Sequence, residues 1–210
     1  ITSEALVGHE ARLLGAAAEA IRGGAVLLQY RDKWNPPSTR LRQASRLAAL
    51  CREHGVPLII NDDPALAASA GAHGVHLGAG DAGIAPARAR LGAAALIGAS
   101  CGNSLARAQA AVAAGADYVA FGRFFASRTK PQAPPAEIET LRAARAALGV
   151  PICAIGGITP DNADTLIDAG ADLVAAIDGV FGAADVEGAA RAYAHAFSRR
   201  RTLPGNSAGN

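Results

Sequence analysis

Charged side chains follow directly after several of the short apolar runs of this chain. Arg31 and Lys33 come after one such run, Asn61 and Asp62 after the next, and Asp81 after a third. Arginine and lysine neutralise phosphate groups, and carboxylates bind hard cations such as Mg²⁺. Brought together, these residue types could hold a diphosphate and the cation that bridges its oxygens.

Further along, a hydroxyl group, another lysine and paired glycines follow other apolar runs. Ser100 ends one run, Lys130 lies in a long polar segment, and Gly156-Gly157 follow a third run. Glycine backbone N–H groups can hold a second phosphate, and so can the turn after Ile177. Taken singly, each feature also fits a surface ion pair, a tight turn or a solvated loop. Their convergence after successive runs favours the binding of phosphorylated molecules.

Short apolar runs alternate with helical patterns along the whole chain. The runs do not alternate in polarity, and several follow a glycine that ends a helix, which is typical of parallel strands buried on both faces. This cadence predicts a single-domain α/β fold, the (β/α)8 or TIM barrel, whose reactive groups lie at the carboxyl ends of the strands. The expected strands are residues 1–2, 26–30, 57–60, 75–77, 96–100, 118–121, 151–155 and 173–177, and the expected helices are residues 9–22, 39–54, 64–70, 85–91, 105–114, 136–148, 161–169 and 186–198.

The barrel prediction also indicates which side chains face the mouth and where the domain ends. Alternation along a strand places Gln29, Arg31 and Lys33 on one side, aimed into the mouth. Residues 1–198 are expected to form the barrel and residues 199–210 a disordered tail. Because Ile1 already lies in an expected strand, that strand is expected to begin upstream. A doubly wound open sheet is the alternative fold, but no Gly-x-Gly-x-x-Gly motif follows an early run to support it.

Composition narrows the classes of function. Half of the 210 residues are apolar and the formal net charge is +2, so the chain can bury one core but gives no electrostatic reason to bind nucleic acid. No apolar run approaches the length of a membrane span. The three cysteines are odd in number and lack metal-binding spacing, which indicates a reducing cytoplasm. We therefore expect a cytoplasmic protein with small-molecule partners and neither nucleic acid nor membrane among them. The sequence leaves open whether the protein forms a homo-oligomer.

The ordered motifs of the chain resemble those of the thiamine phosphate synthase family, over nearly its whole length. This resemblance implies a transferase that joins 4-amino-5-hydroxymethyl-2-methylpyrimidine diphosphate to hydroxyethylthiazole phosphate, giving thiamine phosphate and diphosphate. It also implies Mg²⁺ as the cofactor. The motifs are Gln29–Lys33, Ile60–Asp62, Gly74–Gly78, Phe121–Lys130 and Ala154–Thr159.

The resemblance implies roles for individual residues as well. The pyrimidine diphosphate would be held by Gln29, Arg31, Lys33, Asn61, Ser100 and Lys130, of which Arg31, Ser100 and Lys130 would act in catalysis. Mg²⁺ would be bound by Asp62 and Asp81. The thiazole phosphate would lie against Ser127, Thr129, Gly156, Gly157, Ile177 and Asp178. The sequence shows no nucleophile–base pair or zinc cluster, and the reaction needs neither if the pyrimidine C–O bond ionises first.

Some positions depart from the family pattern. Ala79-Gly80 replace a common polar pair, Ser127 replaces a threonine, and Asp178 stands where a serine is common, so its carboxylate must point away from the phosphate. The related thiazole tautomerase is an alternative function, and it is expected to carry a histidine where this chain has Arg123. A non-catalytic phosphate-binding barrel is another alternative. His76 is predicted to be a packed, hydrogen-bonded core residue.

Overall fold

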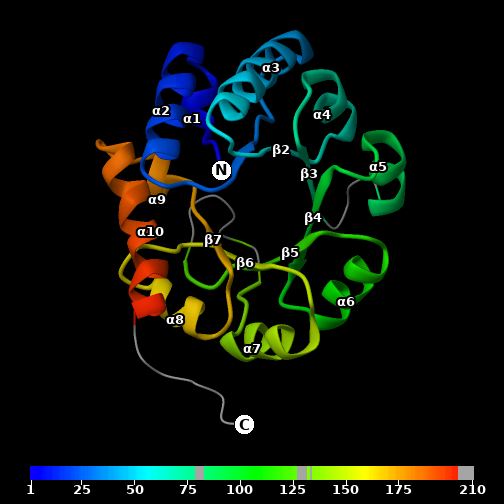
Figure 1. Cartoon of the computed structure of the whole chain (residues 1–210), viewed down its shortest axis with the longest axis vertical. Coiled ribbons are helices and arrows are strands. Elements are labelled where there is room, and N and C mark those ends of the chain that lie inside the picture. Colours follow the sequence, from blue (N-terminus) through cyan, green and yellow to red (C-terminus); the bar gives the residue numbers. More distant parts are fainter. Residues whose placement is uncertain (79–82, 127–131, 133, 203–210) are drawn as a thin grey trace.

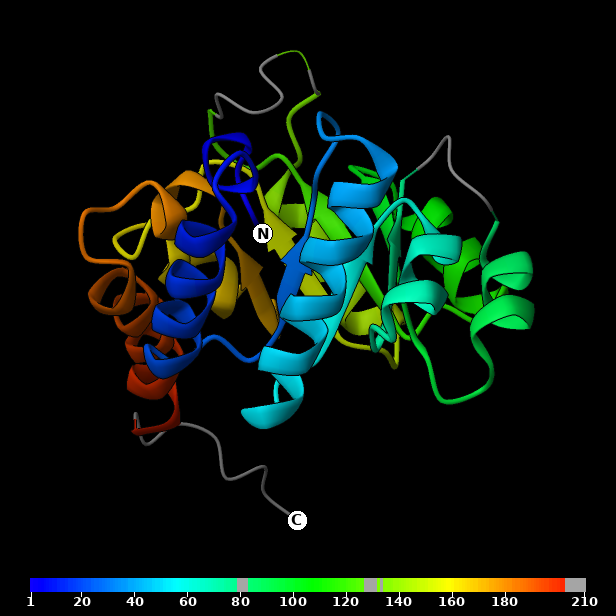
Figure 2. The ribbon, with the colours of Figure 1, turned by 90° about the horizontal axis from the view of Figure 1, so that it is seen from above.

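The computed structural model describes residues 1–78, 83–126, 132 and 134–202. Their parallel strands form one sheet whose spatial order follows the chain from β1 to β7. The sheet curls, and the helices lie around its outer side (Figure 1), as the side view in Figure 2 also shows. The predicted α/β barrel architecture is confirmed. The strands are β1 Leu28–Tyr30, β2 Leu58–Asn61, β3 Gly74–Leu77, β4 Leu96–Gly102, β5 Tyr118–Gly122, β6 Ile152–Ile155 and β7 Leu173–Ala175.

The helices predicted from the sequence are all present, with ends shifted by a few residues. Two short helices, α1 and α9, were not predicted, because four residues carry no helical periodicity. The last helix, α10, extends to Thr202 and so enters the segment 199–210 that was expected to be a disordered tail; residues 203–210 lie outside the described residues. The helices are α1 Glu4–Val7, α2 Glu10–Arg22, α3 Pro37–Glu53, α4 Pro64–Ala70, α5 Ile84–Leu91, α6 Leu105–Ala113, α7 Ile138–Ala147, α8 Ala163–Asp168, α9 Asp178–Phe181 and α10 Val186–Thr202.

The chain start lies between the first and last strands of the sheet. The Thr2 N–H donates to the Gln29 carbonyl at 2.9 Å, and the Ile1 nitrogen lies 2.9 Å from the Ala176 carbonyl oxygen. Residues 1–2 were predicted to be a strand, and the described residues contain seven strands that do not include them. Two residues make too few ladder bonds to form a strand. They nevertheless bridge β1 to the residue after β7.

Caps fix where several helices begin. The Ser104 hydroxyl accepts from the Arg107 N–H at 3.2 Å and Asp185 Oδ1 from the Gly188 N–H at 2.8 Å, as expected for N-caps. Ser38 does not cap α3, although serine is a common N-cap residue. That helix begins at Pro37, because proline at the first helical position has the required φ and needs no N–H partner.

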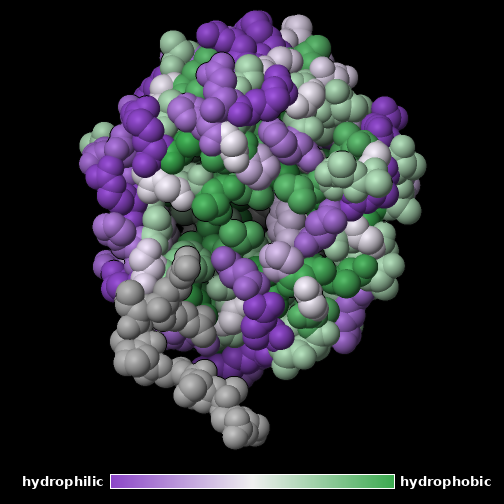
Figure 3. Space-filling model, in the orientation of Figure 1, coloured by the Kyte–Doolittle hydropathy of each residue, from purple (hydrophilic) through white to green (hydrophobic). Residues whose placement is uncertain are grey.

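Small aliphatic side chains fill the core between helices and sheet. Leu13, Ala17, Leu47 and Ala48 are fully buried, and alanine lets the helices lie close to the strands. Figure 3 shows hydrophobic residues around the centre of the molecule and hydrophilic residues over the outer helices. A mostly apolar cavity of about 340 Å³ lies between β1, β7 and α10. In the described part of the chain, no helix is both long enough and apolar enough to span a membrane.

Candidate active site

The end of β1 carries a guanidinium that neighbouring groups hold in place. The Arg31 N–H donates to Thr2 Oγ1 at 2.8 Å, and the Thr2 hydroxyl lies 3.1 Å from the Arg31 carbonyl oxygen. The Arg31 guanidinium carbon lies 5.4 Å from the centre of the Trp34 ring, a cation–π contact that limits where the side chain can turn. Gln29, one alternation earlier on the strand, is buried. The carboxyl end of β1 therefore presents an oriented cation beside a buried amide.

Asp62 follows β2 in a conformation that few residues adopt. Its φ is +65°, and its N–H donates to the His76 carbonyl on the adjacent strand β3 at 2.8 Å. Its carboxylate lies 2.9 Å from the Lys33 ammonium. The cap of α4 is the next residue, Asp63, whose Oδ1 accepts from the Leu66 N–H at 2.9 Å. Asp63 and not Asp62 therefore caps α4, and the left-handed backbone of Asp62 is the kind of strain that gathers at functional sites.

The predicted metal pair can be described only in part. Asp62 lies after β2, and β2 pairs with β3, so the strand adjacency behind the prediction holds. Asp81 lies outside the described residues, as do Ser127, Thr129 and Lys130. Among the residues that are described, no three His, Cys, Asp or Glu side chains gather as a metal site. A single carboxylate completed by substrate oxygens and water is still a common way to hold Mg²⁺.

A chain of hydrogen bonds crosses the interior of the barrel beneath this mouth. His76 Nε2 lies 2.8 Å from the Ser100 hydroxyl and Nδ1 lies 3.0 Å from the Tyr118 hydroxyl. His76 is buried, as the sequence predicted, and both of its ring nitrogens have partners. Ser100, near the carboxyl end of β4, is half-buried. The structure thus links the predicted site residue Ser100 to two side chains of the core.

A second pocket lies at the carboxyl ends of β6 and β7. It measures about 330 Å³, and its wall includes Gly156, Gly157, Ile177 and Asp178, four of the residues predicted to surround a phosphate. Gly156 and Gly157 have φ values of +104° and +63°, which glycine adopts without strain. A Cβ at Gly157 would overlap the Ala126 carbonyl oxygen, so the loop after β5 packs directly on the glycine backbone.

The glycine turn is fixed by one side chain that the sequence analysis did not single out. Asn162 Oδ1 accepts from the Thr159 N–H at 2.8 Å, and Asn162 Nδ2 donates to the Gly157 carbonyl at 3.2 Å. An asparagine close after a glycine turn is a common signal for such bonds. The pocket wall therefore stands in a defined conformation.

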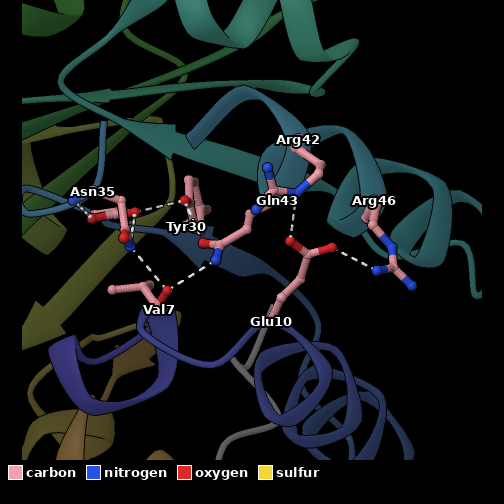
Figure 4. A network of polar contacts seen from close by, with 8 residues as sticks. Val7, Glu10, Tyr30, Asn35, Arg42, Gln43 and Arg46 are labelled. Atoms are coloured by element: carbon pink, nitrogen blue, oxygen red, sulfur yellow. Dashed lines mark hydrogen bonds and ion pairs between the residues drawn. The ribbon is translucent and has the colours of Figure 1, made fainter. Parts of the chain in front are cut away.

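A polar network supports the β1–α3 loop (Figure 4). Asp32 Oδ1 accepts from the N–H groups of Trp34 and Asn35, both at 3.0 Å, and Asp32 Oδ2 accepts from Asn35 Nδ2 at 2.9 Å. The Tyr30 hydroxyl lies 2.9 Å from Asp32 Oδ2 and 2.8 Å from Gln43 Oε1. Gln43 and Asn35 both donate to the Val7 carbonyl at 2.9 Å. The network ties the loop to α1 and α3.

Asp32 is buried and charged, and its bonds keep it so. Burial raises the pKa of its carboxyl, but the hydrogen bonds from Asn35 and Trp34 outweigh burial and hold that pKa below its ordinary value. Burial, followed by the neighbouring Asp32, raises the pKa of the Tyr30 hydroxyl, which remains a donor. The sequence analysis did not identify Asp32 as the centre of this network. The network includes Gln43 and Val7, which lie far from Asp32 in the sequence, and no local pattern shows that they are close in space.

Removal of the Asp32 carboxylate should destabilise the fold. In Asp32→Ala the buried Tyr30 hydroxyl and the Asn35 amide lose an acceptor, and we expect a loss of about 2 kcal/mol in the free energy of unfolding, measured by denaturant titration. The control is Glu10→Ala, which breaks exposed ion pairs with Arg42 and Arg46 in the same view (Figure 4). It should cost clearly less. Equal losses in the two variants would contradict the assigned role of Asp32.

Comparison with known proteins shows the family of the chain. The family model described as thiamine monophosphate synthase matches residues 1–180. The chain belongs to this family. The thiamine-phosphate synthase of Methylococcus capsulatus is 56% identical over 191 residues, which cover 91% of this chain and 84% of that protein. That of Alcanivorax borkumensis is 49% identical over 207 residues, covering 97% of this chain and 95% of that protein.

Solved structures agree with the assignment to the thiamine monophosphate synthase family. The structure of thiamine phosphate pyrophosphorylase from Pyrococcus furiosus superposes with a TM-score of 0.85 at 31% identity, covering 94% of this chain and 93% of that one. A 3-hexulose-6-phosphate synthase superposes with a TM-score of 0.62 at 22% identity, covering 93% and 95%. The second similarity concerns the fold alone, and it shows that this barrel also occurs in another enzyme.

Proposed function

We propose that this chain is the transferase that joins 4-amino-5-hydroxymethyl-2-methylpyrimidine diphosphate to hydroxyethylthiazole phosphate in thiamine biosynthesis. The observation that carries the proposal is the pairing of two polar regions at one end of the sheet. Arg31 and the Lys33–Asp62 ion pair follow β1 and β2, and Ser100 lies near the carboxyl end of β4. The glycine pocket follows β6 and β7. A diphosphate and a monophosphate would each find a matching region. The high identity to thiamine-phosphate synthases over most of the chain supports the same reaction.

The first region would bind the pyrimidine diphosphate and stabilise its leaving group. Arg31 and Lys33, with Lys130 from the loop after β5, supply positive charge to the diphosphate oxygens. The amides of Gln29 and Asn61 and the hydroxyl of Ser100 would hold the rest of that substrate. The bond from the pyrimidine methylene to oxygen breaks, and diphosphate leaves with the electron pair. The thiazole nitrogen then forms the new C–N bond to the methylene carbon.

The protein contributes position and charge to this reaction rather than a nucleophile. The aminopyrimidine ring can itself stabilise the cation left on the methylene carbon. What remains is to keep the departing diphosphate bound and to hold the thiazole nitrogen close to that carbon, which is catalysis by electrostatics and orientation. Because the substrate ring stabilises the cation and the protein only binds and orients, a site built from cations, amides and hydroxyls is sufficient.

The second region would hold the thiazole phosphate. The backbone of Gly156, Gly157 and Ile177 lines the pocket, and Ser127 and Thr129 are proposed to complete it. Asp178 lies in the wall as an exposed residue at the start of α9. A carboxylate turned towards the phosphate would repel it, so we propose that only the backbone of Asp178 serves the ligand.

Asp178→Ser tests that proposal. Because the carboxylate points away from the phosphate, the KM for the thiazole phosphate should stay within about threefold of the wild-type value in steady-state assays. Gly157→Ala serves as the positive control, since its Cβ would overlap Ala126 and its φ of +63° disfavours alanine. A KM for Asp178→Ser that falls about tenfold would mean that the carboxylate repels the phosphate after all.

Mg²⁺ is the proposed cofactor of the diphosphate region. The Asp62 carboxylate would hold it, with Asp81 as the second carboxylate, and the substrate's own oxygens would complete the coordination. The fit rests on the chemistry of the donor: the Asp62 carboxylate supplies oxygen ligands, and the cap of α4 is Asp63 instead. The Lys33 ammonium beside Asp62 would attract the negative charge of the diphosphate. When bound, the ion would offset charge on the departing diphosphate.

The three cysteines support a reducing cytoplasm as the compartment. Cys51, Cys101 and Cys153 are all free and buried. Burial raises the pKa of each thiol, to about 11 for Cys51 and Cys101 and about 12 for Cys153, which keeps them protonated and unreactive. They act as small apolar core residues.

A turnover assay with both substrates and Mg²⁺ tests the proposed function. Formation of thiamine phosphate and diphosphate in equal amounts, dependent on both substrates, is the expected result. A phosphate-binding barrel without activity would bind the pyrimidine diphosphate and release it unchanged. A tautomerase would convert a thiazole precursor without any pyrimidine substrate. Either of these outcomes would overturn the proposal.

A further inference from the structure

Three neighbouring strands bring His76 and Tyr118 into contact across a glycine. In the sheet register His76 of β3 pairs with Gly98 of β4, and Gly98 pairs with Tyr118 of β5. A Cβ at Gly98 would overlap the Tyr118 ring, so the missing side chain is what lets that ring lie across β4. The ring centres of Tyr118 and His76 are 5.5 Å apart. Ser100, two residues beyond Gly98, lies on the same face of β4.

The hydrogen bonds of this group have a direction. The Tyr118 hydroxyl is buried, and within the described part of the chain its one hydrogen-bond partner is His76 Nδ1, at 3.0 Å. Burial raises the pKa of the phenol, so it keeps its proton. If Nδ1 carried a hydrogen and the neutral ring accepted at Nε2, the phenolic proton would have no acceptor, which is costly for a buried group. The phenol therefore donates to Nδ1.

The direction carries over to Ser100. With Nδ1 accepting, the neutral imidazole holds its hydrogen on Nε2. The Ser100 oxygen, 2.8 Å from Nε2, must accept that hydrogen. Its own hydroxyl hydrogen is then directed away from His76. Since Ser100 keeps part of its surface accessible near the carboxyl end of β4, that hydrogen can reach a bound molecule.

We propose that Tyr118 and His76 are positioning residues that fix Ser100 as a hydrogen-bond donor towards the pyrimidine diphosphate. The proposal deepens the proposed function and rests on the substrate assigned there. It specifies the chemistry that Ser100 recognises: a hydrogen-bond acceptor, such as a ring nitrogen or a diphosphate oxygen, and not the exocyclic amino group. Gly98 is part of this arrangement, because any side chain there would displace the Tyr118 ring.

Tyr118→Phe removes the phenolic donor and keeps the ring that covers Gly98. Without that donor both histidine tautomers become accessible and Ser100 loses its fixed direction. We expect kcat/KM for the pyrimidine diphosphate to fall about tenfold, the order of one hydrogen bond, while the KM for the thiazole phosphate stays unchanged. The matched control is Cys153→Ala, which removes a buried atom beside Tyr118 without touching the hydrogen-bonded chain, and it should retain wild-type kinetics. A fall in Cys153→Ala equal to that in Tyr118→Phe would overturn the proposal.

A double-mutant cycle separates positioning from a structural role. If Tyr118 acts through the Ser100 hydroxyl, adding Tyr118→Phe to Ser100→Ala should cause no further fall in kcat/KM. Equal falls in the presence and absence of the serine would show that Tyr118 acts elsewhere.

The tautomer of His76 can be measured without turnover, so this result does not depend on the proposed function. In ¹⁵N NMR spectra of histidine-labelled protein, we expect the Nε2–H tautomer in the wild type and a mixture in Tyr118→Phe. An Nδ1–H tautomer in the wild type would overturn the inference even if thiamine phosphate is formed. Conversely, failure to form thiamine phosphate would defeat the proposed function while leaving this spectrum as predicted.

Discussion

Arg31→Ala should lower kcat/KM for the pyrimidine diphosphate by about 100-fold, the typical cost of losing one preorganised electrostatic donor. The guanidinium is preorganised in two ways. Thr2 fixes the backbone of Arg31, and the Trp34 ring lies 5.4 Å from the guanidinium carbon. A cation already held in place loses little freedom when the diphosphate binds, and it stabilises the charge that grows as the C–O bond breaks. Steady-state kinetics with both substrates measure the effect.

Two further variants show whether charge or shape is responsible. Arg31→Lys keeps the charge but loses the planar fork that matches phosphate oxygens, so it should recover only part of the activity. Arg42→Ala removes an exposed arginine that pairs with Glu10 on the outer side of α3, and it should leave kcat/KM unchanged. Wild-type activity in Arg31→Ala would remove Arg31 from the site.

The local signals that predicted the fold are visible in individual elements. Helix α4 was predicted with its observed bounds, Pro64–Ala70, because Pro64 begins it and Gly71 ends it with a φ of +64°. The prediction for the preceding helix, α3, missed its first two residues, Pro37 and Ser38. The helix begins at Pro37 because proline is well suited to the first helical position.

The site could be predicted where it depends on strand ends and not where it depends on register. Alternation predicted Gln29, Arg31 and Lys33 on the side of the mouth; in the structure Lys33 pairs with Asp62 after β2, while Tyr30 and Asp32 bond to each other in the buried network. The contact between His76 and Tyr118 across Gly98 requires knowing which residues of β3, β4 and β5 are paired. No spacing along the chain gives that register, so the sequence indicated a core histidine but not its partners.

Chelation should abolish turnover, and added Mg²⁺ should restore it. The residue that makes this prediction specific is Asp62. Its backbone is held in the left-handed region by a bond to β3, it does not cap α4, and its carboxylate meets the Lys33 ammonium at the place where the diphosphate is proposed to bind. Two carboxylates and a diphosphate gathered at neighbouring strand ends would repel one another, and a divalent cation relieves that repulsion.

Asp62→Asn is the sharpest probe of the metal, because asparagine tolerates the left-handed φ of +65° and should leave the fold intact. The Mg²⁺ concentration for half-maximal activity should rise by at least about tenfold. Loss of a residue that only hydrogen-bonds to a metal ligand already lowers metal affinity by about that factor, and Asp62 is proposed to be a ligand itself. Asp81→Asn should raise the required Mg²⁺ concentration in the same way.

The matched control is Asp63→Asn. The Asp63 carboxylate caps α4, asparagine can replace it as a cap, and the Mg²⁺ dependence should not change. An unchanged Mg²⁺ dependence in Asp62→Asn would remove Asp62 from the metal site. Full activity of the wild type in excess EDTA would refute the metal proposal as a whole.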